Sequence, residues 1–546
     1  METMPPVSGK RLVTALCLGA VPAVMAFAVQ ASAFKGNDFA FACMGAICVA
    51  GCILFLKKGE ILSGTLSWSL LLCFALFPVG IGALVLDVPV TNDEEAYLLQ
   101  ADLFAAGDTV EKMSPAPEAL FRRQVFEDAT SGVRFSKYPP GTSLALAIGT
   151  WLGSPRFSIF LAAFLDLIFL IGICRALGIA KPGSVALLFA FAPFHLLVHT
   201  SFQSEVFTVP GILAGYWALL NLRKTQHSAW LLSAIVGAAA GWVFLCRPLT
   251  GVVFACACAP SLLFRRHGLG SIFGAILGGL PFLGLLLFWQ FERTGDIWLS
   301  PYHLYAQAFG PWDAGLLQQG IRSPLDVYGN GDFFFGFLGQ FAKWSVALGG
   351  ILGAVGLGFW GLSRLRSRDG WAGLLLSIGL PLAYSFHWYP GHWGYLGPLY
   401  AFESLAFLTF GFVFILEQAP TRWARGLSCG ALVWGLICFL SNLTALEAHS
   451  TWRAGPVSAA VEHAPRNAVI LLPSSPEGMK NWVTSRWPFQ DNEPVMIREQ
   501  RNFVATMESL ERLGLTNRPV FRFIPASGIV PLELVQRLDE SSKSKE

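Results

Sequence analysis

The chain has 546 residues, of which 54% are apolar and only 13% are charged. Soluble domains carry about 25% charged residues, so this composition excludes an ordinary water-soluble enzyme, and its high hydrophobicity excludes a disordered chain. The formal net charge of +3 is too small for a nucleic-acid-binding surface, so no nucleic-acid partner is expected. The composition instead predicts a protein with many spans in a lipid bilayer.

Apolar runs long enough for membrane helices recur along the chain, so we expect an all-α polytopic membrane protein with about thirteen spans. The first run ends in Ala31-Ser32-Ala33, which resembles a signal-peptide cleavage site. Its apolar length of about 20 residues exceeds that of a signal, which predicts a retained anchor. The runs lie near residues 12–33, 39–56, 62–86, 157–177, 183–200, 205–221, 228–246, 249–264, 269–290, 333–360, 371–389, 397–416 and 427–445.

Basic residues at alternate turns indicate the orientation, because cytoplasmic loops carry the excess of lysine and arginine. All of them fall on one side if the N-terminus is cytoplasmic. The polar regions Asp87–Lys137, Glu292–Asp332 and Glu447–Glu546 then lie outside the cytoplasm. The basic turns contain Lys57 and Lys58, Arg175 and Lys181, Arg223 and Lys224, Arg265 and Arg266, Arg364 to Arg368, and Arg422 and Arg425.

The last hundred or so residues have a soluble character, and they predict a small extracytoplasmic α/β domain. The expected strands are Ala468–Leu472, Val495–Ile497 and Val520–Ile524, and the expected helices are Phe503–Leu513 and Leu532–Leu538. We therefore expect N-terminal spans over 1–61, a transmembrane catalytic module over 62–445, and the C-terminal domain over 446–546. Within the module, the first outer loop covers 87–140 and contains interfacial helices.

An acidic segment, Asp93-Glu94-Glu95-Ala96-Tyr97, follows the third apolar run. If it is helical, Asp93 and Tyr97 share one face at i, i+4, with Glu94 on the adjacent edge. A carboxylate just outside the bilayer can take a proton from an incoming hydroxyl. The alternative is an exposed acidic helix start, since charge runs usually mark solvated faces.

A second motif, Lys137-Tyr138-Pro139-Pro140-Gly141, leads into a short apolar stretch that is expected to lie along the membrane interface. The two prolines force an extended turn, which fixes Lys137 at the membrane surface beside Tyr138. An ammonium there suits a lipid phosphate. The alternative is an ordinary lysine that extends to the interface at the end of a span.

Three further elements fall on the outer side by the same alternation of turns. Glu205 ends the segment that begins at His199, Arg247 lies between two spans, and an aromatic turn contains Tyr389 and His392. Ionisable groups at membrane depth are candidates for function, and guanidinium recognises phosphate. The alternatives are a helix cap for Glu205, a helix-end arginine for Arg247 and an interfacial aromatic belt for the turn.

With these elements in this order, residues 60–445 resemble the C-type glycosyltransferase superfamily, whose members are multispanning enzymes that use polyprenyl-phosphate sugars. The nearest likeness is to the branch of lipid A aminoarabinose transferases and protein O-mannosyltransferases. The resemblance implies many membrane helices and an extracytoplasmic active site. It rests on Asp93-Glu94-x-x-Tyr97, Lys137-Tyr138-Pro139-Pro140-Gly141, the His199–Glu205 junction, Arg247-Pro248 and Gly394-Tyr395-Leu396-Gly397-Pro398.

The resemblance also implies residue roles. Asp93 becomes the general base, with Glu94 beside it as a further catalytic residue. Glu205 matches the second outer acidic site and is also predicted to be catalytic. Lys137 and Arg247 match basic residues associated with the carrier phosphate. We add His392 as a third phosphate ligand, and Tyr97, Tyr138 and Tyr389 as substrate contacts.

The sequence departs from that branch in two places. Two additional spans precede the acidic loop, and Ser136 and Tyr138 flank Lys137 where the aminoarabinose transferases carry an acidic residue. A metal site is therefore not carried over, and the spacing of His303 and His392 does not support one. No metal ligand is predicted and no particular cofactor is assigned, and dependence on a divalent metal stays open.

These observations predict a hexosyl- or pentosyltransferase that moves a sugar from a polyprenyl-phosphate donor to a hydroxyl on a lipid, glycan or protein. The reaction takes place outside the cytoplasm, in a bacterial inner or plasma membrane. Direct attack opposite the phosphate predicts inversion at the anomeric carbon. The main alternative is a lipid or solute transporter or flippase, which Asp166 and Glu403 inside predicted spans would suit. A third is an assembly scaffold without catalysis.

Overall fold

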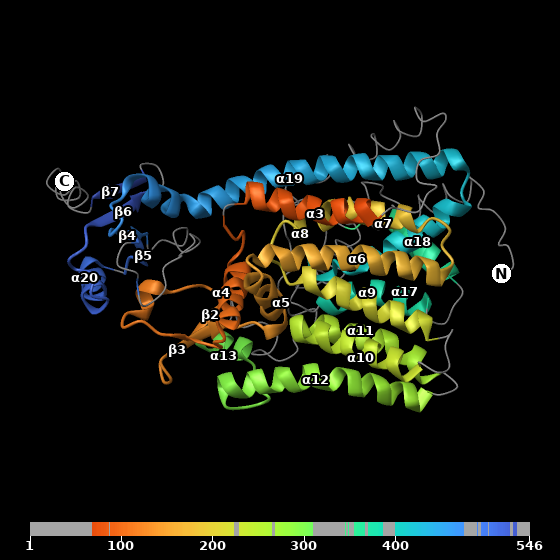
Figure 1. Cartoon of the computed structure of the whole chain (residues 1–546), viewed down its shortest axis with the longest axis horizontal. Coiled ribbons are helices and arrows are strands. Elements are labelled where there is room, and N and C mark those ends of the chain that lie inside the picture. Colours follow the sequence, from red (N-terminus) through yellow and green to blue (C-terminus); the bar gives the residue numbers. More distant parts are fainter. Residues whose placement is uncertain are drawn as a thin grey trace, which may run out of the picture. The chain divides into compact units, whose positions relative to one another are not determined.

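The computed structural model describes most of the chain beyond its first 67 residues (Figure 1). Two compact units are present: unit 1 covers 1–80, 139–145 and 156–443, and unit 2 covers 81–138, 146–155 and 444–546. The described residues are 68–86, 88–222, 229–264, 268–309, 344, 348, 354–365, 370–385, 399–473, 489, 493–500, 502–524 and 528–531.

Unit 1 is helical in its described part, and α9, α10, α11 and α12 lie side by side (Figure 1). Helices α3, α5 and α19 each contribute several residues to both units. The helices are α3 Trp68–Val85, α5 Pro140–Trp151, α6 Pro155–Leu177, α7 Pro182–Ala190, α8 Pro193–Val198, α9 Glu205–Asn221, α10 Ala229–Cys246, α11 Pro248–Leu263, α12 Gly268–Thr294, α13 Pro301–Phe309, α16 Ala354–Arg364, α17 Gly370–Tyr384, η2 Leu399–Ala401, α18 Ser404–Gln418 and α19 Thr421–His463.

Among the described helices, five are long and apolar enough to cross a membrane: α3, α6, α10, α12 and α19. Helices α11, α17 and α18 are apolar but shorter. The mostly helical membrane architecture is thus present, while the number of thirteen spans stays a prediction. One expected span, 183–200, is two short helices, α7 and α8, because the ring of Pro193 cannot continue the first helix and begins the second one.

Small residues allow the close packing of α10 against α12. A Cβ atom on Gly237 would lie 1.7 Å from the carbonyl oxygen of Ala275, and one on Gly278 would lie 1.9 Å from that of Ala234. Only glycine fits at either position. The two backbones therefore touch directly, as is common between membrane helices.

Unit 2 contains two small sheets. The first has the order β1-β3-β2 and is antiparallel, and the second has the order β5-β4-β6-β7, in which only the β6–β7 pair is antiparallel. The elements of the unit are α4 Asn92–Ala106, β1 Glu111–Lys112, η1 Pro117–Leu120, β2 Val125–Asp128, β3 Val133–Ser136, β4 Val469–Leu472, β5 Val495–Arg498, α20 Phe503–Arg512, β6 Val520–Ile524 and β7 Gly528–Pro531.

The three strands and the first helix expected near the C-terminus are present at nearly the predicted bounds. Strand β7 is not predicted by the sequence, and the predicted helix Leu532–Leu538 lies outside the described residues. One face of the second sheet packs on Ala119 and Leu120 of η1, which lies in the segment 87–140 that is predicted to be the first outer loop. The predicted domain boundary at 446 lies inside α19 and stays a prediction.

Glu127 gives unit 2 a pH-dependent element. It lies on β2 opposite Arg134 of β3, and burial raises the pKa of its carboxyl to about 7, against a smaller opposing effect of Arg134. The folded state therefore favours the protonated carboxyl. This contribution to stability is complete below the unfolded pKa of about 4.5 and is lost as pH rises toward 7.

We therefore expect the melting temperature of the wild-type protein to fall more between pH 5 and pH 8 than that of Glu127→Gln, which stays neutral. Thermal unfolding of both proteins in one detergent measures this. The exposed Glu493→Gln is the control and should follow the wild type. Parallel curves for Glu127→Gln and the wild type would contradict the assignment.

Candidate active site

The acidic segment begins helix α4, and its three acids have different environments. Thr91 caps the helix, because its hydroxyl oxygen accepts the Glu94 backbone N–H at 3.2 Å. The buried Glu94 carboxylate accepts the Thr91 hydroxyl at 3.2 Å and the Val90 N–H at 3.4 Å. This arrangement is close to a capping box. Asp93 is half-buried at the second helical position.

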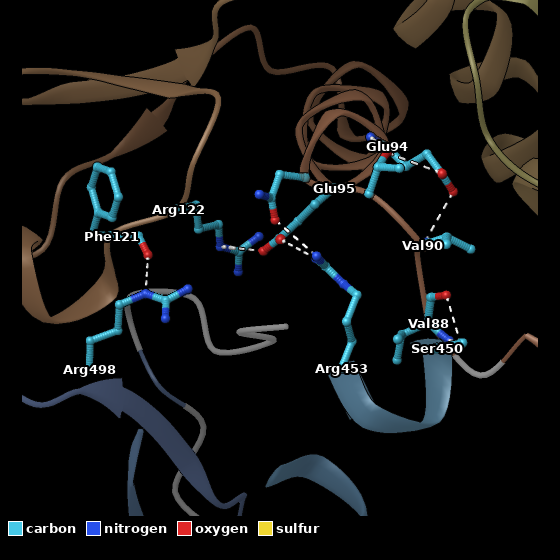
Figure 2. A network of polar contacts seen from close by, with 11 residues as sticks. Val88, Val90, Glu94, Glu95, Phe121, Arg122, Ser450, Arg453 and Arg498 are labelled. Atoms are coloured by element: carbon cyan, nitrogen blue, oxygen red, sulfur yellow. Dashed lines mark hydrogen bonds and ion pairs between the residues drawn. The ribbon is translucent and has the colours of Figure 1, made fainter. Parts of the chain in front are cut away.

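Glu95 is held by arginines from distant parts of the chain, as Figure 2 shows. The Arg453 Nη2 atom lies 3.2 Å from its Oε2 atom, and the Arg122 Nε atom lies 4.0 Å from its Oε1 atom. Arg453 also donates to the Asn92 side-chain oxygen at 3.0 Å. All three charged side chains are buried. Helix α19 therefore fixes the start of α4, and these contacts give Glu95 a structural role.

Replacing Arg453 with methionine should destabilise unit 2 by about 3–5 kcal/mol, because it removes the nearer of the two arginines from the buried Glu95 carboxylate. Urea or thermal unfolding of the purified protein measures the loss. The double variant Glu95→Gln with Arg453→Met should recover part of it. Arg466→Met, at an exposed position, serves as the control. If Arg453→Met lowers the free energy of unfolding as little as Arg466→Met does, the ion pairs of Glu95 do not stabilise unit 2.

The predicted lysine motif meets α4 in unit 2. The Ser136 N–H donates to the Gln100 side chain on α4 at 3.2 Å, and the Lys137 N–H donates to the Gln124 carbonyl at 3.1 Å. Lys137 is 3% exposed, and its ammonium lies 5.2 Å from the centre of the Tyr138 ring. The Tyr138 and Tyr97 rings are 4.7 Å apart.

These contacts connect the two motifs that the sequence singles out. Tyr97 lies one helical turn after Asp93, and through Tyr138 it connects α4 to Lys137. Asp93, Tyr97, Tyr138 and Lys137 are named the α4–β3 cluster here. It combines a half-buried carboxylate, a buried ammonium and two phenol rings.

A second polar cluster lies within unit 1, where Arg247 joins two carboxylates. The Arg247 Nη1 atom lies 3.1 Å from Glu205 Oε1 and 3.1 Å from Glu403 Oε1. Glu403 also accepts the Thr208 hydroxyl at 2.7 Å. All four side chains are buried. The sequence suggests Glu403 only as a feature of a transporter. Its position beside Arg247 and Glu205 was not predicted from the sequence.

Two tyrosines complete this Arg247 cluster. The guanidinium carbon lies 5.1 Å from the Tyr384 ring centre and 5.2 Å from that of Tyr400, and the two rings stack at 4.9 Å. The Tyr384 hydroxyl is 2.7 Å from that of Thr250. Both ion pairs use Nη1, and neither Nε nor Nη2 hydrogen-bonds to any residue that the structure describes. The Nε–Nη2 edge is one that can bind phosphate in bidentate fashion.

Gly141, at the end of the lysine motif, packs on the turn that precedes Arg247. A Cβ atom there would lie 2.7 Å from the Cys246 backbone nitrogen and 2.7 Å from the Leu245 carbonyl carbon. Backbone atoms cannot move aside cheaply, so the position requires glycine.

We expect Gly141→Ala to lower the free energy of unfolding by about 1–3 kcal/mol, as overpacked sites do. Thermal unfolding monitored by tryptophan fluorescence tests this. Gly284→Ala in α12 is the matched control, because among the described residues no atom beyond its chain neighbours and the nearby backbone of its own helix lies within 4 Å of the position that its Cβ atom would occupy. Equal melting temperatures of the two alanine variants would show that the close approach of Gly141 to the backbone of Leu245 and Cys246 does not affect stability.

Several predicted site residues lie outside the described residues. These are Tyr389, His392 and the Gly394–Pro398 turn. His303 is described in α13, where its N–H donates to the Ser300 hydroxyl at 3.1 Å. Within the described part of the chain, metal-ligand geometry occurs instead at Asp166, His195 and His199, a group that the sequence does not suggest.

The fold of the chain is similar to the fold of solved C-type glycosyltransferases. No protein-family model matches the sequence, and no curated protein matches it significantly. Solved structures do match. ArnT from Cupriavidus metallidurans bound to undecaprenyl phosphate has a TM-score of 0.51 at 14% identity, over 84% of this chain and 93% of that chain.

The apo form of ArnT from the same organism gives a TM-score of 0.50 at 14% identity, over 83% of this chain and 92% of that chain. The oligosaccharyltransferase AglB from Archaeoglobus fulgidus, in complex with an inhibitory peptide and a dolichol-phosphate, gives 0.43 at 12% identity, over 84% and 70%. The two ArnT matches confirm the predicted resemblance to this superfamily for the fold.

Proposed function

We propose that the protein is a membrane glycosyltransferase that moves one sugar from a polyprenyl-phosphate donor to a hydroxyl acceptor. The observation that carries the proposal is the α4–β3 cluster, in which the Tyr97 ring, one helical turn after the candidate base Asp93, packs on Tyr138 beside the candidate phosphate ligand Lys137. The shared fold with ArnT, whose structure contains undecaprenyl phosphate, supports the class of donor.

In this proposal Asp93 is the general base. Its carboxylate takes the acceptor's hydroxyl proton as the acceptor oxygen bonds to the anomeric carbon. The bond from that carbon to the phosphate oxygen breaks, and its electron pair leaves on the phosphate. Attack opposite the leaving group inverts the anomeric carbon. Lys137 supplies positive charge for the departing phosphate, and Tyr97 and Tyr138 are proposed substrate contacts.

Glu94 has a different part in the same segment. The sequence predicts it to be catalytic, but its carboxylate accepts hydrogen bonds from Thr91 and Val90 at the start of α4. Those contacts favour a positioning role, in which Glu94 holds the first turn that carries Asp93. A charged carboxylate there also interacts favourably with the helix dipole.

Within unit 1, Arg247 remains our predicted ligand of a carrier phosphate. Glu205 and Glu403 orient its guanidinium and leave the Nε–Nη2 edge without a hydrogen bond to the described residues. Glu205, predicted as the second acidic site, is proposed to act through this orientation. His392 and Tyr389 remain predictions from the sequence.

An apolar cavity of about 600 Å³ between α10, α11 and α12 supports a lipid carrier. Its lining includes Phe244 and Gly251, which flank Arg247 in the sequence, and Ala255, Ile276 and Leu283. Almost all of its walls are aliphatic or aromatic carbon. We propose that part of the polyprenyl chain lies in this cavity.

The remaining features of the proposal come from the sequence. They are about thirteen spans, a cytoplasmic N-terminus, an extracytoplasmic site and C-terminal α/β domain, and a bacterial inner or plasma membrane. The acceptor is a lipid, glycan or protein hydroxyl. The domain limits at 61/62 and 445/446 are likewise proposed.

A transporter or flippase is the second candidate, and Asp166 favours it. This carboxylate is fully buried in α6, and buried intramembrane acids commonly serve ion or substrate paths. Measured flux of a lipid-linked sugar across proteoliposomes, without sugar transfer, would select this alternative.

Mass spectrometry of envelope glycolipids and proteins, with and without the gene, tests the proposed function. Loss of one hexose, pentose or aminosugar from one acceptor is expected, and it identifies donor class and acceptor together. The wild-type gene should restore the modification, whereas a gene that encodes Asp93→Asn should not. Identical envelopes with and without the gene would overturn the proposal.

A further inference from the structure

Three buried side chains of metal-binding types meet inside unit 1, and none of them has a part in the proposed sugar transfer. Asp166 lies in the middle of α6, His195 lies in α8, and His199 caps the C-terminal end of α8. Each is at most 1% exposed. Their ligand atoms all lie within 4.8 Å of one another. The Asp166 Oδ2 atom is 3.4 Å from His199 Nε2 and 3.8 Å from His195 Nε2.

Backbone contacts fix the tautomer of both histidines. The His199 Nδ1 atom lies 2.9 Å from the His195 carbonyl, and the His195 Nδ1 atom lies 3.3 Å from the Ala190 carbonyl. A carbonyl oxygen only accepts hydrogen bonds, so each Nδ1 carries a proton. In the neutral imidazoles, both Nε2 atoms then present a lone pair toward Asp166.

This geometry brings acceptors together without a donor. Among the described residues, neither Asp166 oxygen and neither Nε2 atom has a hydrogen-bond partner. Buried polar groups that stay unsatisfied are costly, and an unpaired carboxylate is costlier still. A positive ion between the three side chains would satisfy all of them.

A single proton does this less well than a metal ion. Protonation of one histidine gives one Nε2–H donor, which leaves the other Nε2 lone pair facing the same carboxylate. Zinc bonds of about 2.0–2.2 Å in tetrahedral geometry place neighbouring ligand atoms about 3.3–3.6 Å apart. The two measured distances, 3.4 and 3.8 Å, are close to that spacing.

The surroundings also resemble those of metal sites. Metal-bound histidines usually donate the other ring N–H to a carbonyl or carboxylate, as both do here. The ring of Phe189 lies 4.5 Å from the His195 ring, and that of Phe402 lies 6.4 Å away. These buried aromatic rings exclude water from one side of the cluster.

We propose that Asp166, His195 and His199 bind one divalent transition-metal ion of the zinc class, which links α6 to α8. Two imidazoles and a carboxylate suit zinc and its neighbours better than magnesium or calcium. The ion would fix α8, which Pro193 separates from α7, against a spanning helix. This site does not depend on the proposed sugar transfer.

The test measures metal in the full-length protein, purified through a tag without histidine and dialysed against metal-free buffer. Elemental analysis after addition and removal of excess zinc should give about one zinc per chain in the wild type. Asp166→Asn, His195→Gln and His199→Gln should each lower it at least about tenfold. Asp296→Asn and His303→Gln, which lie outside the cluster, should keep the wild-type value.

A second measurement needs no variant and therefore does not depend on whether the variants fold. Treatment of the wild type with 1,10-phenanthroline should lower its melting temperature, zinc should restore it, and the non-chelating 1,7 isomer should have no effect. The proposal is overturned if the wild type retains no zinc and its melting temperature ignores the chelator. Equal zinc retention in wild type and all three cluster variants would also overturn it.

Discussion

Asp93→Asn should lower the rate of sugar transfer by about 10²–10⁴-fold, the usual contribution of a general base. Asparagine keeps the size and helix position of the side chain but cannot take the acceptor proton. The protein should still insert in the membrane and melt near the wild-type temperature, because Thr91 and Glu94 make the capping contacts of α4. Single-turnover transfer to the acceptor measures the rate.

Two variants on the same helix separate catalysis from folding. Asp102→Asn, about two and a half turns further along α4, should leave transfer near the wild-type rate. Glu94→Gln should lower the melting temperature more than Asp93→Asn does, because it weakens the contacts with Val90 and Thr91. Wild-type transfer by an Asp93→Asn protein that inserts normally would remove Asp93 from the catalytic role.

Arg247→Met should lower the free energy of unfolding by about 3–5 kcal/mol, because it leaves the buried Glu205 and Glu403 carboxylates without their shared cation. Thermal unfolding in detergent micelles measures this loss. The exposed Arg175→Met in α6 is the control and should change stability little. If Arg247 binds the carrier phosphate, transfer should also fall in any Arg247→Met protein that remains folded.

A double variant shows whether the carboxylates cause the loss. Glu403→Gln added to Arg247→Met removes one unpaired charge, so stability should partly recover. Lack of any recovery would mean that Arg247 acts through its packing on Tyr384 and Tyr400 instead. Arg247→Lys should keep the charge but lose the bidentate edge, so it separates stability from phosphate binding.

Short-range patterns in the sequence were informative about local structure. Asp93 and Tyr97 were expected on one face if their segment is helical, and both do lie in α4. The proline pair was expected to force an extended turn after Lys137, and the next helix, α5, begins at Pro140. The strands near the C-terminus were found from their apolar runs. These features depend on neighbouring residues, which periodicity and turn chemistry reflect directly.

Long-range partners were not predictable in the same way. Arg453 lies 358 residues from Glu95, and Glu403 lies 156 residues from Arg247. No spacing rule connects such pairs. In the sequence, each of these residues is a charged residue in or next to an apolar helix. That position indicates that the charge needs a partner, but it does not identify the partner.

Helix ends were a further difficulty for the sequence. The apolar run ended near residue 445, but α19 continues to His463 because its polar second part packs within unit 2 through Arg453 and Ala460. The span expected over 183–200 is interrupted before Pro193. A sliding hydropathy window detects only the length of an apolar segment. It therefore misses both the polar continuation of α19 and the interruption before Pro193.

Sugar transfer by the purified full-length protein in lipid nanodiscs tests the central claim most directly. Polyprenyl monophosphates carrying a hexose, a pentose or an aminosugar are supplied with membranes from cells that lack the gene as acceptor. The account predicts that one donor releases free polyprenyl phosphate and that an acceptor gains the mass of that sugar, with Asp93→Asn inactive. Movement of the intact donor between leaflets, with no sugar transferred from any donor, would contradict it.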